Sequence, residues 1–212
     1  MTTEHLDWAK KVFVVPRGIP RRVELYGGHL GSDSYSIPGG STTKYILRTS
    51  QFPSSVANGE EYSEGTTSST SAEEVVSKTF YYSHATVGKM IVRGTVDVDA
   101  AVSLKTSDSS ATATLSSVVI KFGILRSNGV GEEIFSKTLT TNLTSTSTSY
   151  EDYSVVVTGE VDDIYTVEEG DVPYITVTLY GKISDGAQTG YFKLRYGYAT
   201  SNLRVEIPVL EA

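Results

Sequence analysis

Apolar and polar residues alternate along much of the chain, most regularly between Met90 and Lys105. In this stretch the even positions are apolar except at Gly94, while most odd positions carry polar or charged side chains. A period of two over this length predicts a long β-strand with one buried and one solvent-facing side. The next alternating run changes phase at Ser116-Ser117, which indicates a β-bulge that inserts one residue and reorients the side chains after it.

Turn signals divide the alternating pattern into further strands. Asn128-Gly129 is typical of a tight β-hairpin and leads into a strand from Glu132 to Thr140, and shorter alternating runs follow as far as residue 209. About eight strands with a turn signal roughly every ten to fifteen residues are typical of an all-β sandwich or barrel. Because their lengths are unequal, a jelly roll is favoured. We therefore predict an all-β protein with a jelly-roll-like antiparallel β-sandwich over residues 74–212.

The residues before this sandwich have a different pattern. Residues 1–50 contain short apolar runs, such as Val12 to Val15, between dense Pro and Gly turn signals. Such a segment has too little apolar surface for a core of its own. We predict an extended, turn-rich N-terminal arm with short strands that docks on another surface. Residues 51–73 form a polar Ser/Thr/Glu stretch, which predicts a flexible linker.

Composition narrows the class of protein. The chain has 212 residues, of which 39% are hydrophobic and 20% charged, with 19 Gly, 14 Tyr and no Cys. The lack of cysteine excludes disulfides, thiolate metal ligands and cysteine nucleophiles. No apolar run reaches the roughly 20 residues that span a bilayer, and the first residues lack the apolar region of a signal peptide. We therefore predict a protein made in the cytoplasm, without a membrane partner.

Charge is distributed unevenly along the sequence. The net charge of −7 argues against a general nucleic-acid binder. Residues 1–50 carry a net +3, whereas the remainder carries −10. Because opposite charges favour a protein–protein contact, we expect the arm to dock on the acidic surface of a neighbouring subunit. The candidate docking residues are Trp8, Lys10, Lys11, Arg17, Arg21 and Arg22.

No motif in the sequence predicts catalysis. His5, His29 and His84 have no metal-ligand spacing, and the Gly-x-Ser-x-Gly motif of serine hydrolases is missing. Asp97-x-Asp99 falls on the solvent-facing side of a strand, where a solvated pair is favoured over a calcium site. We therefore predict no catalytic, cofactor-binding or metal-binding residues, no cofactor, and a protein that is not an enzyme.

Tyrosines provide one candidate binding surface. Tyr174 and Tyr180 fall on the outward face of one predicted strand, near Tyr191, Tyr196 and Tyr198 of the next segment. An aromatic strip of this kind suits subunit contact or stacking on sugar rings, because tyrosine combines an apolar ring with a polar hydroxyl. Tyrosines that cap the edges of the sandwich are a third interpretation, and the sequence leaves the three open.

The order of the predicted elements carries a resemblance. Two long alternating strands, at 89–105 and 112–127, are followed by the Asn128-Gly129 hairpin, a Ser/Thr tract and the turn from Glu168 to Asp171. This order resembles the jelly-roll domains of virion proteins from tailed bacteriophages and archaeal viruses, such as head-decoration, turret and tail or baseplate proteins. The resemblance covers residues 75–212 and transfers no functional residue. It implies a structural, non-enzymatic role on a virus particle, often as a symmetric oligomer.

We therefore expect a non-enzymatic virion structural protein, either a capsid-decoration or turret protein or a tail component. It would form a homo-oligomer and contact other virion proteins, such as the major capsid or tail protein, through its N-terminal arm. The alternative is a carbohydrate-binding β-sandwich module, for example a viral receptor-binding domain in which Tyr174 and Tyr180 stack on a glycan. A β-sandwich hydrolase is a third class, for which the sequence shows no catalytic residues.

Overall fold

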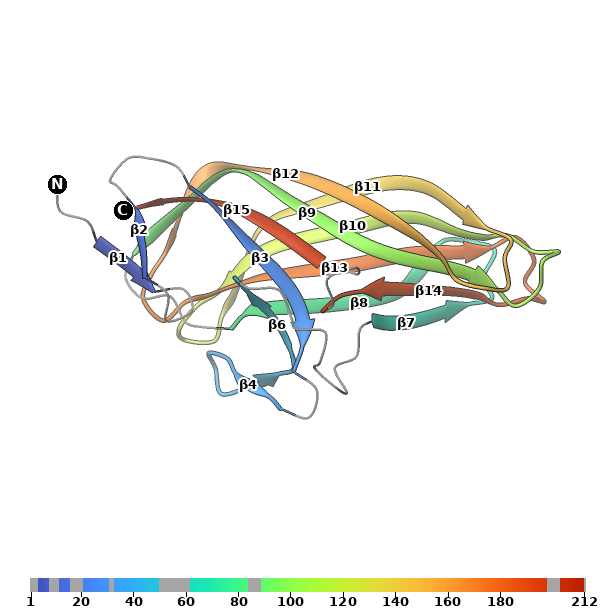
Figure 1. The fold of residues 1–212 in the computed structure, drawn as a ribbon, viewed down its shortest axis with the longest axis horizontal. Helices are drawn as coiled ribbons and strands as arrows, with labels where there is room; N and C mark the ends of the chain where they lie inside the picture. Colours follow the sequence, from blue (N-terminus) through green and yellow to red (C-terminus); the bar gives the residue numbers. More distant parts are fainter. Residues whose placement is uncertain are drawn as a thin grey trace.

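The computed structural model is built from β-strands joined by turns (Figure 1). It describes residues 4–7, 12–15, 21–30, 33–49, 62–83, 89–197 and 203–211. These ranges contain no helix, and therefore none long and apolar enough to cross a membrane. The strands are β1 (Glu4–Asp7), β2 (Val12–Val15), β3 (Arg21–His29), β4 (Tyr35–Ser36), β5 (Thr42–Thr43), β6 (Tyr45–Arg48), β7 (Tyr62–Thr67), β8 (Glu73–Tyr82), β9 (Met90–Thr106), β10 (Ala113–Leu125), β11 (Gly131–Ser145), β12 (Glu151–Val167), β13 (Val172–Ile183), β14 (Gly190–Arg195) and β15 (Leu203–Glu211).

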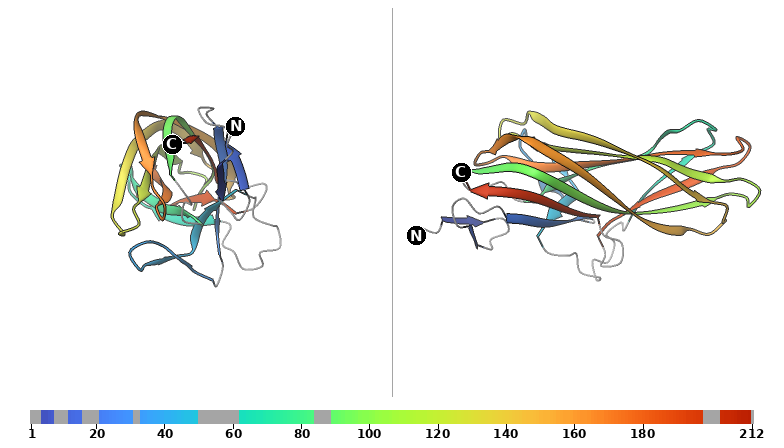
Figure 2. Two further views of the ribbon diagram at one scale, coloured as in Figure 1. Left: turned by 90° about the vertical axis from the view of Figure 1, so that its left-hand side faces the viewer. Right: turned by 90° about the horizontal axis from the view of Figure 1, so that it is seen from above.

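The strands form two layers of a sandwich, which the right-hand view of Figure 2 shows to be elongated along its strands. Sheet I has the order β11-β10-β13-β8, with every neighbouring pair antiparallel. Sheet II is organised around β9, which pairs with β12 along one side. On its other side β9 pairs with β14 over Ala101–Thr106 and with β15 over Met90–Ala100. Strands β7 and β3 complete sheet II outside β14 and β15.

Strand β6 connects the two layers. It pairs antiparallel with β3 of sheet II and parallel with β8 of sheet I. The two sheets are therefore one continuous sheet folded over on itself, closed at the β6 side. The prediction of an all-β, mostly antiparallel sandwich is confirmed.

Alternating residues of the two sheets build the core. On β9 of sheet II, Val96, Val98 and Val102 are fully buried, and on β13 of sheet I, Ile175 and Val177 are buried in the same core. Each fully buried aliphatic side chain of this size contributes about 1.5–3 kcal/mol to folding. The period-two pattern read from the sequence is therefore the pattern that fills the core.

Two local predictions are also confirmed. The register of β10 against both of its neighbours shifts between Leu115 and Ser117, which is the predicted bulge. At the β10–β11 turn, the amide of Gly129 donates to the carbonyl of Arg126 at 2.8 Å, and Gly129 has φ of 85°. A positive φ is accessible to glycine at little cost, which explains why this turn carries a glycine.

The predicted boundaries at residues 50 and 73 do not separate the sandwich from the residues before it. β3 and β6 were assigned to the arm and β7 to the linker, yet all three are hydrogen-bonded within the continuous sheet. The pattern of β7 was misleading because the side chains that it buries are Ser63 and Thr67. Short polar side chains at the buried positions remove the apolar alternation by which a strand is recognised.

The first residues stand apart from the sandwich in hydrogen bonding. β1 and β2 pair with each other and form a separate two-stranded sheet. Of the predicted docking residues, Trp8, Lys10, Lys11 and Arg17 lie outside the described residues. Their docking role stays a prediction.

Candidate functional site

Three tyrosine rings and two lysine side chains alternate on the outer face of sheet II. The ammonium group of Lys193 lies 3.7 Å from the ring centroid of Tyr62 and 3.8 Å from that of Tyr150. The ammonium group of Lys105 lies 4.6 Å from the centroids of both Tyr150 and Tyr191. Each cation is therefore held against two rings by cation–π attraction. We call this group the tyrosine–lysine ladder; in spatial order it comprises Tyr62, Lys193, Tyr150, Lys105 and Tyr191.

Strand register brings the ladder together from four separate segments. On β14, Tyr191 and Lys193 point outward because Phe192 and Leu194 between and after them are buried in the core. Pairing with β9 places Tyr191 opposite Lys105. The remaining two rings come from the first residue of β7 and from Tyr150, which directly precedes β12.

The electrostatics of the two lysines differ. Lys193 also forms an ion pair with Glu64 at 3.6 Å, and its side chain is only 15% exposed. Lys105 has no carboxylate of the described residues within ion-pair distance, and its ammonium group contacts the rings of Tyr150 and Tyr191. Burial raises the pKa of the Tyr150 phenol, and the nearby Glu64 carboxylate raises it further. Tyr150 is therefore a neutral phenol at neutral pH.

A carboxylate lies beside the ladder. Asp152 accepts a hydrogen bond from the Ser103 hydroxyl at 2.6 Å and forms an ion pair with Arg195. The Ser103 hydrogen bond, followed by the hydrogen bond and charge of Arg195, lowers the pKa of Asp152. The side chain of Asp152 is nevertheless 60% exposed, so that one side of the ladder presents an accessible acceptor.

Charged side chains continue along the same face toward β15 and β3. Arg22 forms ion pairs with Asp97 at 2.7 Å and with Glu206 at 2.9 Å, and Arg204 pairs with Glu24 at 3.2 Å. Arg22 was predicted to dock on a neighbouring subunit, but its guanidinium is engaged within its own chain. The sequence could not show this, because β3, β9 and β15 are brought together only by the fold.

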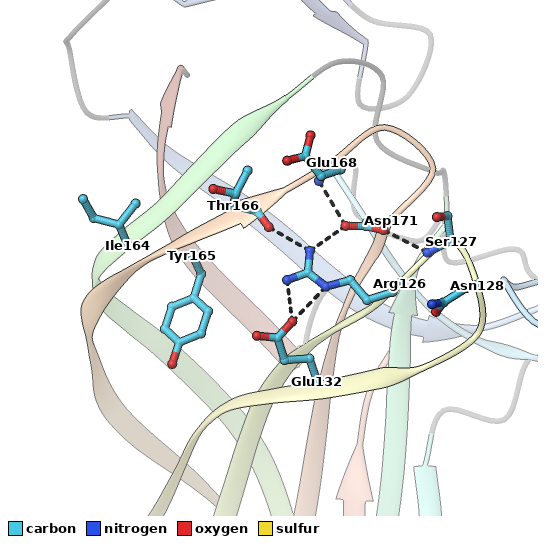
Figure 3. A pocket seen from close by; sticks show the side chains of 9 residues that line it. All are labelled: Arg126, Ser127, Asn128, Glu132, Ile164, Tyr165, Thr166, Glu168 and Asp171. Carbon is cyan, nitrogen blue, oxygen red and sulfur yellow. Dashed lines mark hydrogen bonds and ion pairs between the residues drawn. The ribbon is translucent and has the colours of Figure 1, made fainter.

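A pocket of about 640 Å³ lies at one end of the sandwich, between the β10–β11 turn and the β12–β13 turn (Figure 3). Arg126 is at its centre. Its Nε donates to Glu132 at 2.8 Å, and its Nη1 donates to the carbonyl of Thr166 at 2.8 Å and to Asp171 at 2.7 Å. Burial opposes the charge of Arg126, but the hydrogen bonds to Asp171 and Glu132 outweigh it and raise its pKa.

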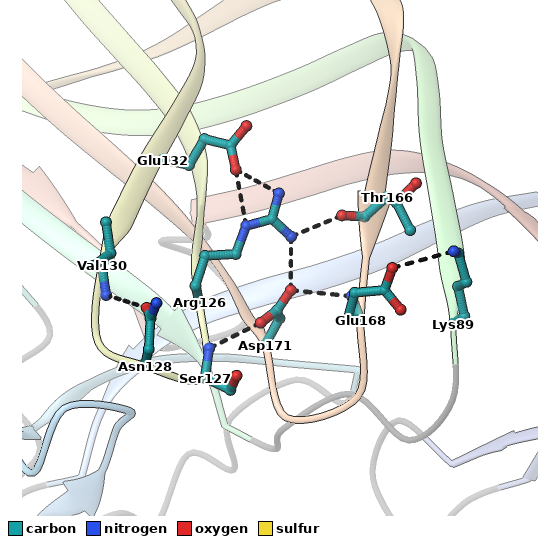
Figure 4. Close-up of polar contacts among 9 residues, drawn as sticks. All are labelled: Lys89, Arg126, Ser127, Asn128, Val130, Glu132, Thr166, Glu168 and Asp171. Atoms are coloured by element: carbon teal, nitrogen blue, oxygen red, sulfur yellow. Dashed lines mark hydrogen bonds and ion pairs between the residues drawn. The ribbon is translucent and has the colours of Figure 1, made fainter.

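Asp171 is the residue that joins the two turns (Figure 4). Its carboxylate accepts from the Arg126 guanidinium and from the backbone amides of Ser127 at 2.8 Å and Glu168 at 3.0 Å. It is only 2% exposed. Since a buried carboxylate needs such donors, Asp171 holds the two turns together, and we call its contacts with Arg126 and the two amides the Arg126–Asp171 cluster. Lys89 adds an ion pair to Glu168 at 3.2 Å.

The predicted tyrosine strip is not continuous in the structure. Tyr174 and Tyr180 do lie on the outward face of β13, where both are half-buried, and Tyr174 packs on Tyr81 with 5.8 Å between ring centroids. β14 is not a neighbour of β13, because it pairs with β7 and β9 in the other sheet. Tyr191 therefore belongs to the ladder, whereas Tyr196 is fully buried and hydrogen-bonded to Ser63 at 2.9 Å. Tyr198 lies outside the described residues.

Sequence reasoning missed most of the ladder. Tyr62 fell within the predicted linker, and Tyr150, which follows the Ser/Thr tract, was given no role. The alternation Tyr191-x-Lys193-x-Arg195 was the available signal, since it places an aromatic and two basic side chains on one face of a strand. Which side chains lie across from them depends on strand register, which this signal does not contain.

No protein-family model matches the sequence, and no curated protein is similar to it. Among solved structures, this chain is similar to a CocE/NonD family hydrolase from Staphylococcus aureus, with 11% identity and a TM-score of 0.54. The match covers 95% of this chain and 40% of the hydrolase. It is also similar to an aminopeptidase from a marine sediment archaeon, Thaumarchaeota archaeon, with 9% identity and a TM-score of 0.55. This match covers 96% of this chain and 39% of the aminopeptidase. The chain thus spans about two fifths of the length of these proteins, with which it shares a fold.

A weaker match is to the VP2 subviral particle of infectious bursal disease virus. It covers 95% of this chain and 43% of that one, at 9% identity and a TM-score of 0.30. A TM-score of this size does not establish a shared fold.

The hydrolase matches correct one prediction. From the sequence we expected a protein that is not an enzyme, but the structures that share its fold with TM-scores of 0.54 and 0.55 are a hydrolase and an aminopeptidase. The prediction is contradicted by this finding and we withdraw it. The prediction failed because alternating strands and turn signals specify only that the fold is a sandwich. Whether a sandwich takes part in catalysis depends on its particular side chains and on the domains around it.

Proposed function

We propose that the protein is a structural subunit of a virus particle, either a capsid-decoration or turret protein or a tail component. The jelly-roll sandwich and the element order that resembles virion proteins support this role. In it, the sandwich is the body of the subunit, and the segment before β3 joins that body to its neighbours.

The observation that carries the proposal is the separate β1–β2 sheet. An isolated two-stranded sheet is marginally stable in water, and pairing or packing against a larger surface stabilises it. β1 and β2 pair only with each other among the described strands. A neighbouring copy of the chain, or another virion protein, would supply the surface on which this hairpin docks.

Charge supports the same arrangement. Because Arg22 is engaged within its own chain and Arg21 also belongs to β3, the docking set reduces to Trp8, Lys10, Lys11 and Arg17. Three of these are basic, and the chain after residue 50 carries a net charge of −10. Opposite net charges steer association and select the partner.

The experiment is a charge reversal in the full chain, with Lys10, Lys11 and Arg17 all changed to Glu. We expect the wild-type protein to sediment as a defined oligomer and the variant as a folded monomer with an unchanged far-ultraviolet circular dichroism spectrum. A matched control reverses Lys89, Lys121 and Lys137 on the sandwich, and should sediment as the wild type does. Oligomers that survive the N-terminal reversal would contradict the proposed role of this segment.

A second candidate is favoured by the fold comparison. Over almost its whole length the chain shares its fold with a part of two hydrolytic enzymes, about two fifths of each. The second candidate function is therefore a hydrolytic activity of this protein. The test is turnover of p-nitrophenyl esters and aminoacyl p-nitroanilides across the fractions of a sizing column. Activity that follows the protein peak would support this candidate, and activity that separates from the peak would remove it.

A further inference from the structure

We propose that the tyrosine–lysine ladder is a binding site for a saccharide that bears a carboxylate, such as a chain ending in a sialic acid or a uronic acid. The site lies on the outer face of sheet II and is separate from the N-terminal segment. The proposal therefore does not depend on how the chain assembles.

The rings supply the surface on which a sugar would stack. Tyr62 is 43% exposed, and it stands at the outer strand of sheet II next to β14. Tyr191, at the other end of the ladder, is half-buried, so its ring has both a packed and an open part. The apolar faces of sugar rings pack on aromatic rings of this kind, while the phenol and neighbouring polar groups bind hydroxyls.

Lys105 determines the charge of the ligand. Its ammonium group is held between two rings, and no carboxylate of the described residues lies within ion-pair distance of it. Lys193, in contrast, already has Glu64 as its partner. A hydrogen bond between an ammonium group and a carboxylate is about twice as strong as a neutral one. A ligand carboxylate would therefore pair with Lys105 in preference to Lys193.

The remaining side chains favour a sugar over a polyanion. Glu64 and Asp152 flank the ladder with side chains that are 35% and 60% exposed. Their oxygens accept hydrogen bonds from hydroxyl groups, which a saccharide has in number. The same two negative charges would repel the successive phosphates of a nucleic acid, whose binding requires an excess of positive charge.

The site is also held in place before any ligand binds. β9 and β14 fix Lys105, Tyr191 and Lys193 by backbone pairing in the middle of sheet II. The rings in turn restrict the two long lysine side chains, which would otherwise lose rotamer freedom on binding. Such preorganisation lowers the entropic cost of association.

The test is an NMR titration of the ¹⁵N-labelled full chain with 3′-sialyllactose and with trigalacturonic acid, using lactose as the neutral probe. We expect at least one acidic saccharide to shift the amide resonances of β7, β9 and β14, and lactose to bind at least tenfold more weakly. Absence of shifts with both acidic saccharides, equal binding of lactose, or shifts confined to sheet I would overturn the proposal. Tighter binding of a short oligothymidylate than of either saccharide would also overturn it.

Variants of Lys105 test whether its charge binds the carboxylate of the saccharide. Lys105→Gln should weaken binding of the acidic saccharide at least tenfold, whereas Lys105→Arg, which keeps a cation able to stack on both rings, should retain it. The matched control is Lys121→Gln on sheet I, whose lysine pairs with Glu133 and which should bind as the wild type does. Unchanged affinity in Lys105→Gln would contradict the assignment.

Discussion

The ring of Phe135 in β11 lies directly on the backbone of Gly159 in β12. A β-carbon added to Gly159 would stand 2.5 Å from Cε2 of Phe135, well inside van der Waals contact. β11 and β12 are the outer strands of their sheets on the side away from β6, and no backbone ladder pairs them. Near the turn that joins them, the Tyr153 hydroxyl donates to the carbonyl of Thr144 at 2.7 Å. Away from that turn, the contact between Phe135 and Gly159 therefore packs the two strands together without backbone pairing.

This contact gives a first prediction. Gly159→Val should lower the free energy of unfolding by about 1–3 kcal/mol, because the added side chain overpacks against Phe135. Urea denaturation followed by fluorescence measures the loss. In the double variant Gly159→Val/Phe135→Ala the ring is gone, so the cost of the valine should become smaller than in the wild-type background. Additive losses would show that the two residues do not interact.

The Arg126–Asp171 cluster gives a second prediction. Asp171→Ala should cost about 2–4 kcal/mol, since it removes the buried acceptor of one guanidinium and two backbone amides. The control is Glu133→Ala, which breaks an ion pair with Lys121 whose two side chains are both nearly half exposed. That loss should stay below about 1 kcal/mol. Similar losses for the two variants in thermal and urea unfolding would refute a special role for Asp171.

Acid stability provides a third prediction. Burial opposes the ionisation of Asp97, but the hydrogen bond from Thr158 and the hydrogen bond and charge of Arg22 outweigh it and lower its pKa. Because the pKa is lower in the folded than in the unfolded chain, ionised Asp97 stabilises the fold at neutral pH. This stabilisation is complete above the ordinary value of 3.8 and is lost as the pH falls through the folded value.

We therefore expect Asp97→Asn to lower the stability at pH 7 and to leave it nearly unchanged at pH 2.5. The difference in melting temperature between the variant and the wild type should therefore become smaller on acidification. Melting temperatures measured from pH 7 to pH 2.5 test this. Asp163→Asn, at an exposed position of β12, serves as the control and should follow the wild type throughout. A difference in melting temperature that grows on acidification would show that ionised Asp97 destabilises the fold, contrary to this prediction.

The sandwich could be predicted because its strands carry the pattern that folding uses. Val96, Val98 and Val102 are apolar at every second position and all three are fully buried. The change of phase after Leu115 likewise reflects a real insertion into the strand, since both neighbours of β10 shift register there. Such features are local, and a single strand contains them.

Other features depend on contacts that the sequence does not contain. β7 was missed because it buries Ser63 and Thr67, so that its buried positions look polar. The ladder was missed because Lys193 and Lys105 meet their rings across strands from distant parts of the chain. The likeness to hydrolases was missed for a different reason, since the same sandwich serves many functions.

The most direct test of the proposed assembly role is the solution mass of the purified full-length protein, measured by light scattering on a sizing column over a range of concentrations. We predict a defined oligomer, with a mass that is an integral multiple of 22.9 kDa and at least twice that value. A single species of 22.9 kDa at every concentration would contradict assembly of this chain with copies of itself.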